Sequence, residues 1–158
     1  MELKVTTLEV LHREISGCQL CPLRRGCRQP VPGTGPANAQ IMMVGEGPGE
    51  EEDRRVAPFV GPSGRVLRQL SQEAGLDIER DVFLTNIVKC RPPNNRDPAQ
   101  GEVRACLPYL DRQIQLIDPK VIIAIGRHAM MQFMPDEGIL KVHGSPRWVN
   151  GSIVMPII

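Results

Sequence analysis

Residues 121–125 read Val-Ile-Ile-Ala-Ile, an apolar run that Gly126 ends. Such an uninterrupted run is typical of a strand buried on both faces of a parallel sheet. Three further apolar segments have a similar length: 40–44, 82–88 and 153–158. Segments with apolar residues at helical spacing alternate with them: 63–74, 98–117 and 127–133. The alternation predicts an α/β fold, a three-layer α/β/α sandwich with a four-stranded, mainly parallel central sheet.

The rest of the chain is expected to form shorter elements. Residues 6–17 have apolar residues at helical spacing and are predicted to form an amphipathic helix. Two polar stretches are interpreted as loops: 50–62 and 143–148. Asp97 is expected to cap the helix that starts at Pro98, because proline suits the first helical turn. In the helix at 63–74, Val66, Leu67, Leu70 and Ala74 are expected on the apolar side.

The composition is that of an ordinary globular domain. The chain has 158 residues, of which 41% are hydrophobic and 23% charged, so a single domain over 1–158 is expected. There is no apolar run of about 18 residues, the length that a membrane-spanning helix needs. The N-terminus also lacks the apolar core of a secretory signal. We therefore expect a cytoplasmic protein. A monomer is also expected.

Five cysteines in a reducing compartment favour a metal site or reactive thiols over disulfides. Cys18 and Cys21 form a C-x2-C pair on a loop, Cys90 follows the second strand, and Cys106 lies within a helix. These four thiolates could converge on one centre, and both zinc and an iron–sulfur cluster accept four thiolates. Two alternatives stay open: a ligand set that includes Cys27, and buried thiols that bind no metal.

Gly-rich and polar segments follow the first two strands, at 45–53 and 86–91. Because ligands bind at the carboxyl ends of parallel strands, these segments are expected to line a binding site. The stretch Gly-Glu-Gly-Pro-Gly at 45–49 could also be a loop for a nucleotide phosphate. The Gly-Lys-Ser/Thr ending of such loops is missing, which speaks against that interpretation.

Three segments together resemble the family 4 uracil-DNA glycosylases, the thermostable, iron–sulfur-containing enzymes of bacteria and archaea. They are Cys18–Leu23, Val44–Asp53 with Pro58–Gly61, and Thr85–Arg96. The last of them, followed by Cys106, is the most specific. Gly47 is a mild departure, since the family usually has alanine there. The resemblance extends over nearly the whole chain.

The resemblance implies an activity, a substrate and a cofactor. The activity is hydrolysis of the N-glycosidic bond of deoxyuridine in DNA, which releases uracil and leaves an abasic site for base excision repair. The partner is uracil-containing DNA, while a replication-clamp partner cannot be read from the sequence. The cofactor is a structural [4Fe–4S] cluster on Cys18, Cys21, Cys90 and Cys106.

Two residues match the family's contacts to the flipped base. Phe59 matches the stacking residue, and stacking on an aromatic ring is worth roughly 1–3 kcal/mol. Asn86 matches the reader of the uracil edge, where its amide can accept from N3–H and donate to O4. Cytosine presents the opposite polarity and would leave these groups unpaired. Without the resemblance, Phe59 could be a core residue and Asn86 a cap at the end of its strand.

The loop after the first strand supplies the other expected contacts. The Glu46 carboxylate could orient water or stabilise positive charge on the sugar. Glu52 matches an acid near the uracil C5 edge, where bulk excludes thymine. Backbone N–H groups around Gly45 and Gly47 could bind uracil O2. Both carboxylates could instead belong to a solvated acidic loop. Lys89 is a candidate for the DNA backbone.

The family also has a His-Pro loop after its fourth strand, whereas this chain reads Met155-Pro156-Ile157-Ile158 there. We therefore expect a truncated or partial chain, and no residue is given the role of that histidine. His128 is interpreted as structural. The alternative function is a non-catalytic iron–sulfur relative that binds DNA or is associated with a polymerase, or an inactive fragment.

Overall fold

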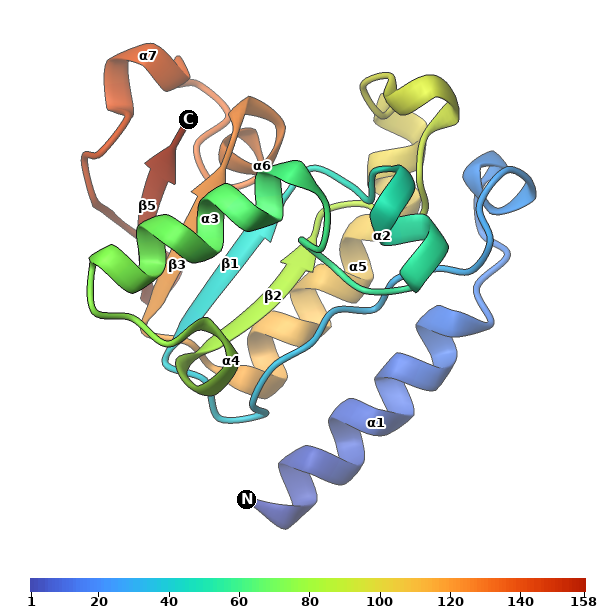
Figure 1. Ribbon diagram of the computed structural model, residues 1–158, viewed down its shortest axis with the longest axis horizontal. Helices are drawn as coiled ribbons and strands as arrows, with labels where there is room; N and C mark the ends of the chain where they lie inside the picture. Colours follow the sequence, from blue (N-terminus) through green and yellow to red (C-terminus); the bar gives the residue numbers. More distant parts are fainter.

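A computed structural model describes residues 1–158 and has a five-stranded sheet at its centre (Figure 1). The strands are β1 (Ile41–Gly45), β2 (Val82–Asn86), β3 (Val121–Ile125), β4 (Arg147–Val149) and β5 (Ser152–Ile157), in the order β2-β1-β3-β5-β4. β2, β1, β3 and β5 run parallel, and β4 pairs antiparallel with β5. The mainly parallel α/β sheet is confirmed, but the expected number of four strands is wrong.

The additional strand, β4, comes from a hairpin in a stretch that the sequence suggested was a loop. Asn150 and Gly151 join β4 to β5, and both have positive φ, 49° and 90°. Two such residues make the tight turn whose twist suits a hairpin, and Asn-Gly is a favoured pair for it. Because β4 is short and exposed at the sheet edge, it has no apolar pattern that would reveal it.

Helices cover both faces of the sheet. They are α1 (Glu2–Ser16), α2 (Glu50–Arg55), α3 (Pro62–Glu73), α4 (Ile78–Asp81), α5 (Gln100–Ile117), α6 (Arg127–Met131) and α7 (Ile139–Val142), with short 3-10 turns η1 (Pro22–Arg25) and η2 (Pro93–Asn95). In Figure 1, α3 crosses the near face of the sheet and α5 lies behind it. The three-layer arrangement is therefore confirmed. No helix combines the length and the apolar character that crossing a bilayer requires.

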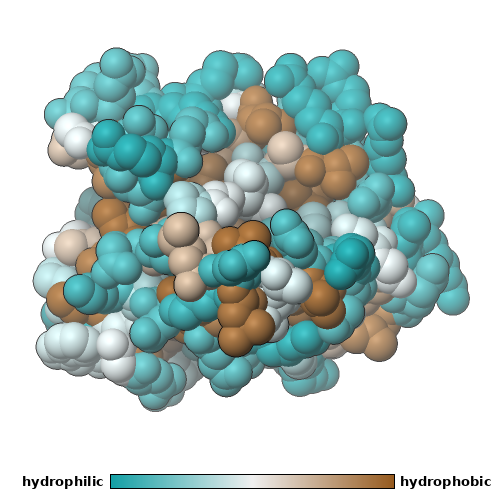
Figure 2. Space-filling view, turned by 90° about the horizontal axis from the view of Figure 1, so that it is seen from below, coloured by the Kyte–Doolittle hydropathy of each residue, from teal (hydrophilic) through white to brown (hydrophobic).

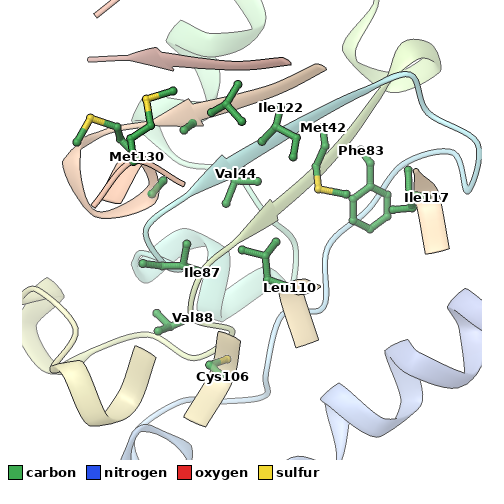
Figure 3. Close-up of a cluster of buried hydrophobic side chains, with 14 of the residues drawn as sticks. Met42, Val44, Phe83, Ile87, Val88, Cys106, Leu110, Ile117, Ile122 and Met130 are labelled. Carbon is green, nitrogen blue, oxygen red and sulfur yellow. The ribbon is translucent and has the colours of Figure 1, made fainter. Parts of the chain in front are cut away.

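Alternate residues of β1 face the two helical layers, as the pleat of a strand requires. Met42 and Val44 belong to the larger core, where they meet side chains of β2, β3 and α5 such as Leu110 (Figure 3). Met43 points the other way and packs with Leu67 of α3 in a smaller cluster. The sheet is thus buried on both faces, which explains its uninterrupted apolar strands.

The buried side of α3 agrees only in part with the predicted one. Leu67 is buried as expected, whereas Val66 and Leu70 are 58% and 56% exposed. The other buried positions are Gly64 and Ser71, whose small side chains leave no apolar signal. Gly64 lets the first turn of the helix approach the loop that precedes it, as the site below requires.

The start of α5 also differs from the prediction. The helix begins at Gln100, and Asp97 does not cap it. The Glu102 carboxylate instead accepts the backbone N–H at the N-cap at 2.7 Å and forms an ion pair with Arg96. Asp97 lies against His128 of α6, which makes it part of a different cluster.

The bounds of α1 and α2 differ from the predicted ones. α2 occupies part of the predicted loop at 50–62, and its acidic first turn and basic last turn both favour a helix. α1 begins at Glu2 and leaves Leu3 and Val10 exposed.

Figure 2 shows the molecule from below, turned by 90° from the view of Figure 1. On this face, apolar residues lie in small groups between hydrophilic ones.

Candidate active site

β1 and β2 end side by side, with Gly45 opposite Asn86 in the register. A cavity of about 640 Å³ opens at this edge. Its walls come from the loop after β1, from the segment that precedes α3 and from the end of β2, and they include Glu46, Glu52 and Phe59. The volume is in the range of small-molecule sites, and the position is the one where parallel sheets bind ligands.

Phe59, Asn86 and Gly45 meet at one point of this cavity. A Cβ atom added to Gly45 would lie 2.5 Å from Asn86 Oδ1 and 2.7 Å from Phe59 Cζ. Any side chain at position 45 would therefore displace the ring or the amide. The structure brings together the two residues that the sequence suggested as base contacts.

Asn86 is 3% exposed, yet its side-chain amide has no hydrogen-bond partner within the protein. Its backbone carbonyl accepts from Lys89 Nζ at 2.7 Å. The polar atoms of this amide keep contact with solvent only at the cavity, where a ligand can bond to them. Asn86 is thus held by its backbone, while its side chain remains available at the cavity.

Phe59 has a left-handed backbone with φ of 54°, which costs a non-glycine residue roughly 1–2 kcal/mol. Arg68 of α3 stabilises it by donating to the Phe59 carbonyl at 2.5 Å, and Glu79 holds the same guanidinium. Gly64 leaves room for this turn, since a Cβ there would lie 1.8 Å from the Phe59 oxygen. The ring is presented by a strained turn that several residues hold in place.

Glu52 braces the same turn from the other side. Its Oε1 accepts the backbone N–H of Gly61, the N-cap of α3, at 2.7 Å. Its Oε2 lies close to Gly49, where a Cβ would be 2.9 Å away. The carboxylate lines the cavity and also fixes the segments on its two sides.

The remaining residues of the loop after β1 are placed by close packing and charge. Gly47 passes so near the chain after β2 that a Cβ would lie 2.7 Å from Val88 Cγ2. Burial raises the pKa of the Glu46 carboxyl above its usual value, and nearby His128 partly opposes this rise in pKa. Glu46 and Gly47 both line the cavity.

Lys89, a candidate for the DNA backbone, is buried instead. Its ammonium group donates to Thr85 Oγ1, to the Asn86 carbonyl and to Gln113 Oε1 at 2.7–2.8 Å. This network joins the end of β2 to α5. It explains how the ammonium group of a buried lysine is satisfied without solvent.

Four cysteines line a second, apolar cavity: Cys18, Cys21, Cys90 and Cys106. They come from the loop after α1, from the chain after β2 and from α5, and Cys106 lies at one end of the core in Figure 3. Cys27 does not line this cavity, although its thiol lies against Cys90. All five cysteines are free of disulfides.

Without a bound metal, the buried thiols are poor acids. Burial raises the pKa of Cys106 to about 11 and that of Cys90 well above its usual range. A metal cation is what ionises thiols in such a place, because it stabilises the thiolate that burial disfavours. The donor set and its apolar surroundings therefore fit a thiolate-bound metal centre.

Comparison with known proteins reveals the family. Residues 32–157 match the model of the uracil DNA glycosylase superfamily. A type-4 uracil-DNA glycosylase of Thermotoga maritima is 43% identical over 152 residues, which cover 94% of this chain and 79% of that protein. The chain belongs to the type-4 uracil-DNA glycosylases. The type-4 enzyme of Sulfurisphaera tokodaii is 49% identical over 87% of the chain.

This type-4 family member spans 65% of the length of the Sulfurisphaera enzyme and 66% of that of its Saccharolobus solfataricus counterpart. The superfamily match begins after Cys18 and Cys21, whereas the Thermotoga alignment covers nearly the whole chain. A DNA polymerase of Bacillus phage SP01 is also similar, at 32% identity over 90% of the chain but 15% of the polymerase.

Two residues that contact the site carry no signal in the sequence. His128 and Asp97 lie next to Glu46, although 82 and 51 positions separate them from it along the chain. Neither is part of a motif that the family resemblance provides. Their proximity results from the packing of α6 and the start of α5 against the end of β1.

Proposed function

We propose that this chain hydrolyses the N-glycosidic bond of deoxyuridine in DNA, releasing free uracil and leaving an abasic site. The observation that carries the proposal is the buried, unpaired amide of Asn86 next to the Phe59 ring, at the carboxyl edge of the sheet. Membership of the type-4 family supports it, since relatives with 43–49% identity have this activity in their names.

Asn86 and Phe59 select the base in this proposal. Duplex DNA hides the glycosidic bond, so the nucleotide has to leave the stack and enter the cavity. The Phe59 ring stacks on the base, and the Asn86 amide pairs with uracil N3–H and O4. Cytosine would leave both polar groups of the amide unpaired, at a cost on the order of 1–3 kcal/mol for each group. The cavity therefore discriminates by polarity as well as by shape.

Glu46 and the Gly-rich loop carry the chemistry in this proposal. As the bond from C1′ to uracil N1 breaks, positive charge develops on the sugar and negative charge on the base. The Glu46 carboxylate stabilises the sugar cation and orients the water that adds to C1′, and backbone N–H groups at Gly45 and Gly47 face uracil O2. Water supplies the hydroxyl group of the sugar and the proton of the released uracil.

A [4Fe–4S] cluster on Cys18, Cys21, Cys90 and Cys106 is the proposed cofactor, with zinc as the alternative. No three of the sulfur atoms lie within 4.8 Å of one another. A tetrahedral zinc site with bonds of about 2.3 Å would bring its sulfurs to roughly 3.8 Å, so the wider spacing favours the larger cluster. When bound, the cluster supplies a structural cross-link. Reduced cysteines also favour the cytoplasm as the compartment.

The cysteine loop leads from the proposed cluster back to the active site. The backbone N–H of Arg28 donates to Asp53 of α2 at 2.9 Å, and the Arg28 guanidinium donates to the Arg54 carbonyl at 2.9 Å. α2 also carries Glu52, which fixes the turn before α3. A cluster that orders the cysteine loop thereby supports the wall that presents Phe59.

The proposal is tested with single-stranded DNA that contains one uracil, incubated with the purified chain and then cleaved with alkali. The expected products are free uracil and a strand break at the uracil position. Asn86→Ala is expected to slow release about tenfold to a hundredfold, through the loss of the base pairing. Asn38→Ala, a matched asparagine outside the cavity, should keep the rate. Binding without release of uracil would instead support a non-catalytic relative, the arrangement that the similarity to a phage DNA polymerase suggests.

A further inference from the structure

Three side chains from separate parts of the fold converge behind the cavity wall. Glu46 follows β1, Asp97 precedes α5, and His128 is in the first turn of α6. His128 Nε2 lies 3.6 Å from Glu46 Oε2 and 3.0 Å from Asp97 Oδ2. Glu46 lines the cavity, whereas the other two residues do not. The imidazole therefore contacts the carboxylate from outside the space that the substrate would occupy.

We infer that His128 is a positioning residue that holds Glu46 as an oriented carboxylate, with Asp97 fixing the imidazole. The inference rests on the proposed function, since it assigns a partner to the carboxylate that faces the sugar. Asp97 is well placed to orient the ring, because its Oδ2 lies closer to Nε2 than Glu46 Oε2 does. Both carboxylates face the same ring nitrogen, so the Asp97 contact fixes the imidazole next to Glu46 at Nε2 itself.

Arg127 gives the cluster two charge-dependent arrangements. Its Nη2 lies 3.1 Å from His128 Nε2 and 3.1 Å from Asp97 Oδ2, so the same ring nitrogen faces a donor and acceptors. A neutral imidazole with Nε2 unprotonated accepts from Arg127. A protonated imidazole donates to Asp97 and places its charge next to Glu46.

The position of Glu46 makes such a partner necessary. Burial raises the pKa of its carboxyl, Asp97 raises this pKa further, and His128 and Arg127 lower it. DNA over the cavity would remove more water and disfavour the carboxylate again. A protonated imidazole at 3.6 Å would oppose this effect from the protein side, where the substrate does not displace it.

The test compares His128→Gln, which removes the charge, with His128→Lys, which keeps one. The Glu46 carboxyl carbon is followed by NMR as the pH changes, and Glu46→Gln identifies its signal. We expect Glu46 in His128→Gln to become protonated at a higher pH than in the unchanged chain, and His128→Lys to restore the lower value. A purely structural role for His128 would affect both variants alike. Equal titration of Glu46 in all three proteins overturns the inference.

The pH dependence of single-turnover uracil release gives a second readout. On the acid side of the profile, His128→Gln should release uracil about tenfold more slowly than the unchanged chain, while the rates converge at higher pH. His143→Gln is the matched histidine control, because His143 accepts only the backbone N–H of Ile158. An unchanged chain that releases no uracil at any pH contradicts the proposed function, whereas the NMR titration still decides the role of His128.

Discussion

At the scale of single residues, the site depends on groups that lack a partner or have one particular partner. The Asn86 amide is buried and free, while its backbone is fixed by a buried lysine. Gly45 has no side chain because the ring of Phe59 and the Asn86 amide occupy that space. Glu102 shows the opposite case of a buried carboxylate whose oxygens are all engaged.

Glu102→Gln is expected to lower the free energy of unfolding by about 1–3 kcal/mol at neutral pH, through weaker bonds to Arg96 and to the start of α5. The bond to Arg96 lowers the pKa of Glu102, and burial partly opposes this. A lowered folded-state pKa stabilises the fold above the usual pKa of 4.5, and this contribution is lost as the pH falls through the lowered value. The difference between the proteins should therefore shrink in acid.

Urea unfolding of both proteins at neutral and strongly acidic pH measures this difference. Glu73→Gln serves as the control, because Glu73 is exposed and hydrogen-bonds only to Gln69 on the same helix. A difference between Glu102→Gln and the unchanged chain that stays constant down to acidic pH would argue against the ion pair as its cause.

The sequence predicts the position of residues that belong to a family motif well. It predicts the position of residues between the motifs poorly. Phe59, Asn86 and Glu46 were predicted from the family resemblance, and the structure gathers them around one cavity. Lys89 was wrongly placed at the DNA, because burial of a lysine depends on partners from α5 that no local pattern reveals. His128 was missed as a neighbour of Glu46 for the same reason.

At the scale of elements, the turn before α3 is the feature on which the site depends most. It holds Phe59 with a positive φ and is braced by Arg68 from α3 and by Glu52 from α2. The buried side of α3 has glycine and serine where the apolar pattern suggests larger residues, so this packing could not be predicted from hydrophobicity. The β4–β5 hairpin has a signal in the sequence, because Asn150-Gly151 is a pair that favours a tight turn between strands.

Arg68→Gln is expected to loosen this turn without unfolding the protein. The variant loses the bond to the Phe59 carbonyl that stabilises the left-handed backbone. Amide hydrogen exchange at residues 56–61 should become faster, while exchange in β1 and β2 stays slow. Arg65→Gln, on the same helix but without such a bond, is the control. Unchanged exchange in the turn of Arg68→Gln would mean that Arg68 does not hold it.

At the scale of the whole molecule, the sheet places two sites at the same end of the fold. Asn86 lines one cavity and Cys90 lines the other, and these two residues are four positions apart in the sequence. Lys89 lies between them, and its backbone N–H donates to Cys106 Sγ at 3.2 Å. The α/β class and the mainly parallel sheet could be predicted because apolar strands alternate with helices, whereas the edge strand has only its turn residues as a signal.

Cys90→Ser and Cys106→Ser are each expected to lose most of the bound iron and sulfide and to unfold at a lower temperature. Each variant removes one of four thiolates, and a metal centre that binds only the folded chain stabilises it. Cys27→Ser should keep iron, sulfide and melting temperature close to those of the unchanged chain. Retention of iron by Cys90→Ser together with its loss from Cys27→Ser would favour the alternative ligand set. Zinc in place of iron and sulfide would favour a zinc site.

Calorimetric titration of the intact protein with free uracil and with free cytosine tests the central claim most directly, because it measures base recognition apart from catalysis. We expect uracil to bind, cytosine to bind at least about tenfold more weakly, and Asn86→Ala to abolish most of this preference. Equal binding of the two bases, or a preference for uracil that survives in Asn86→Ala, would contradict recognition of the base by Asn86 beside Phe59.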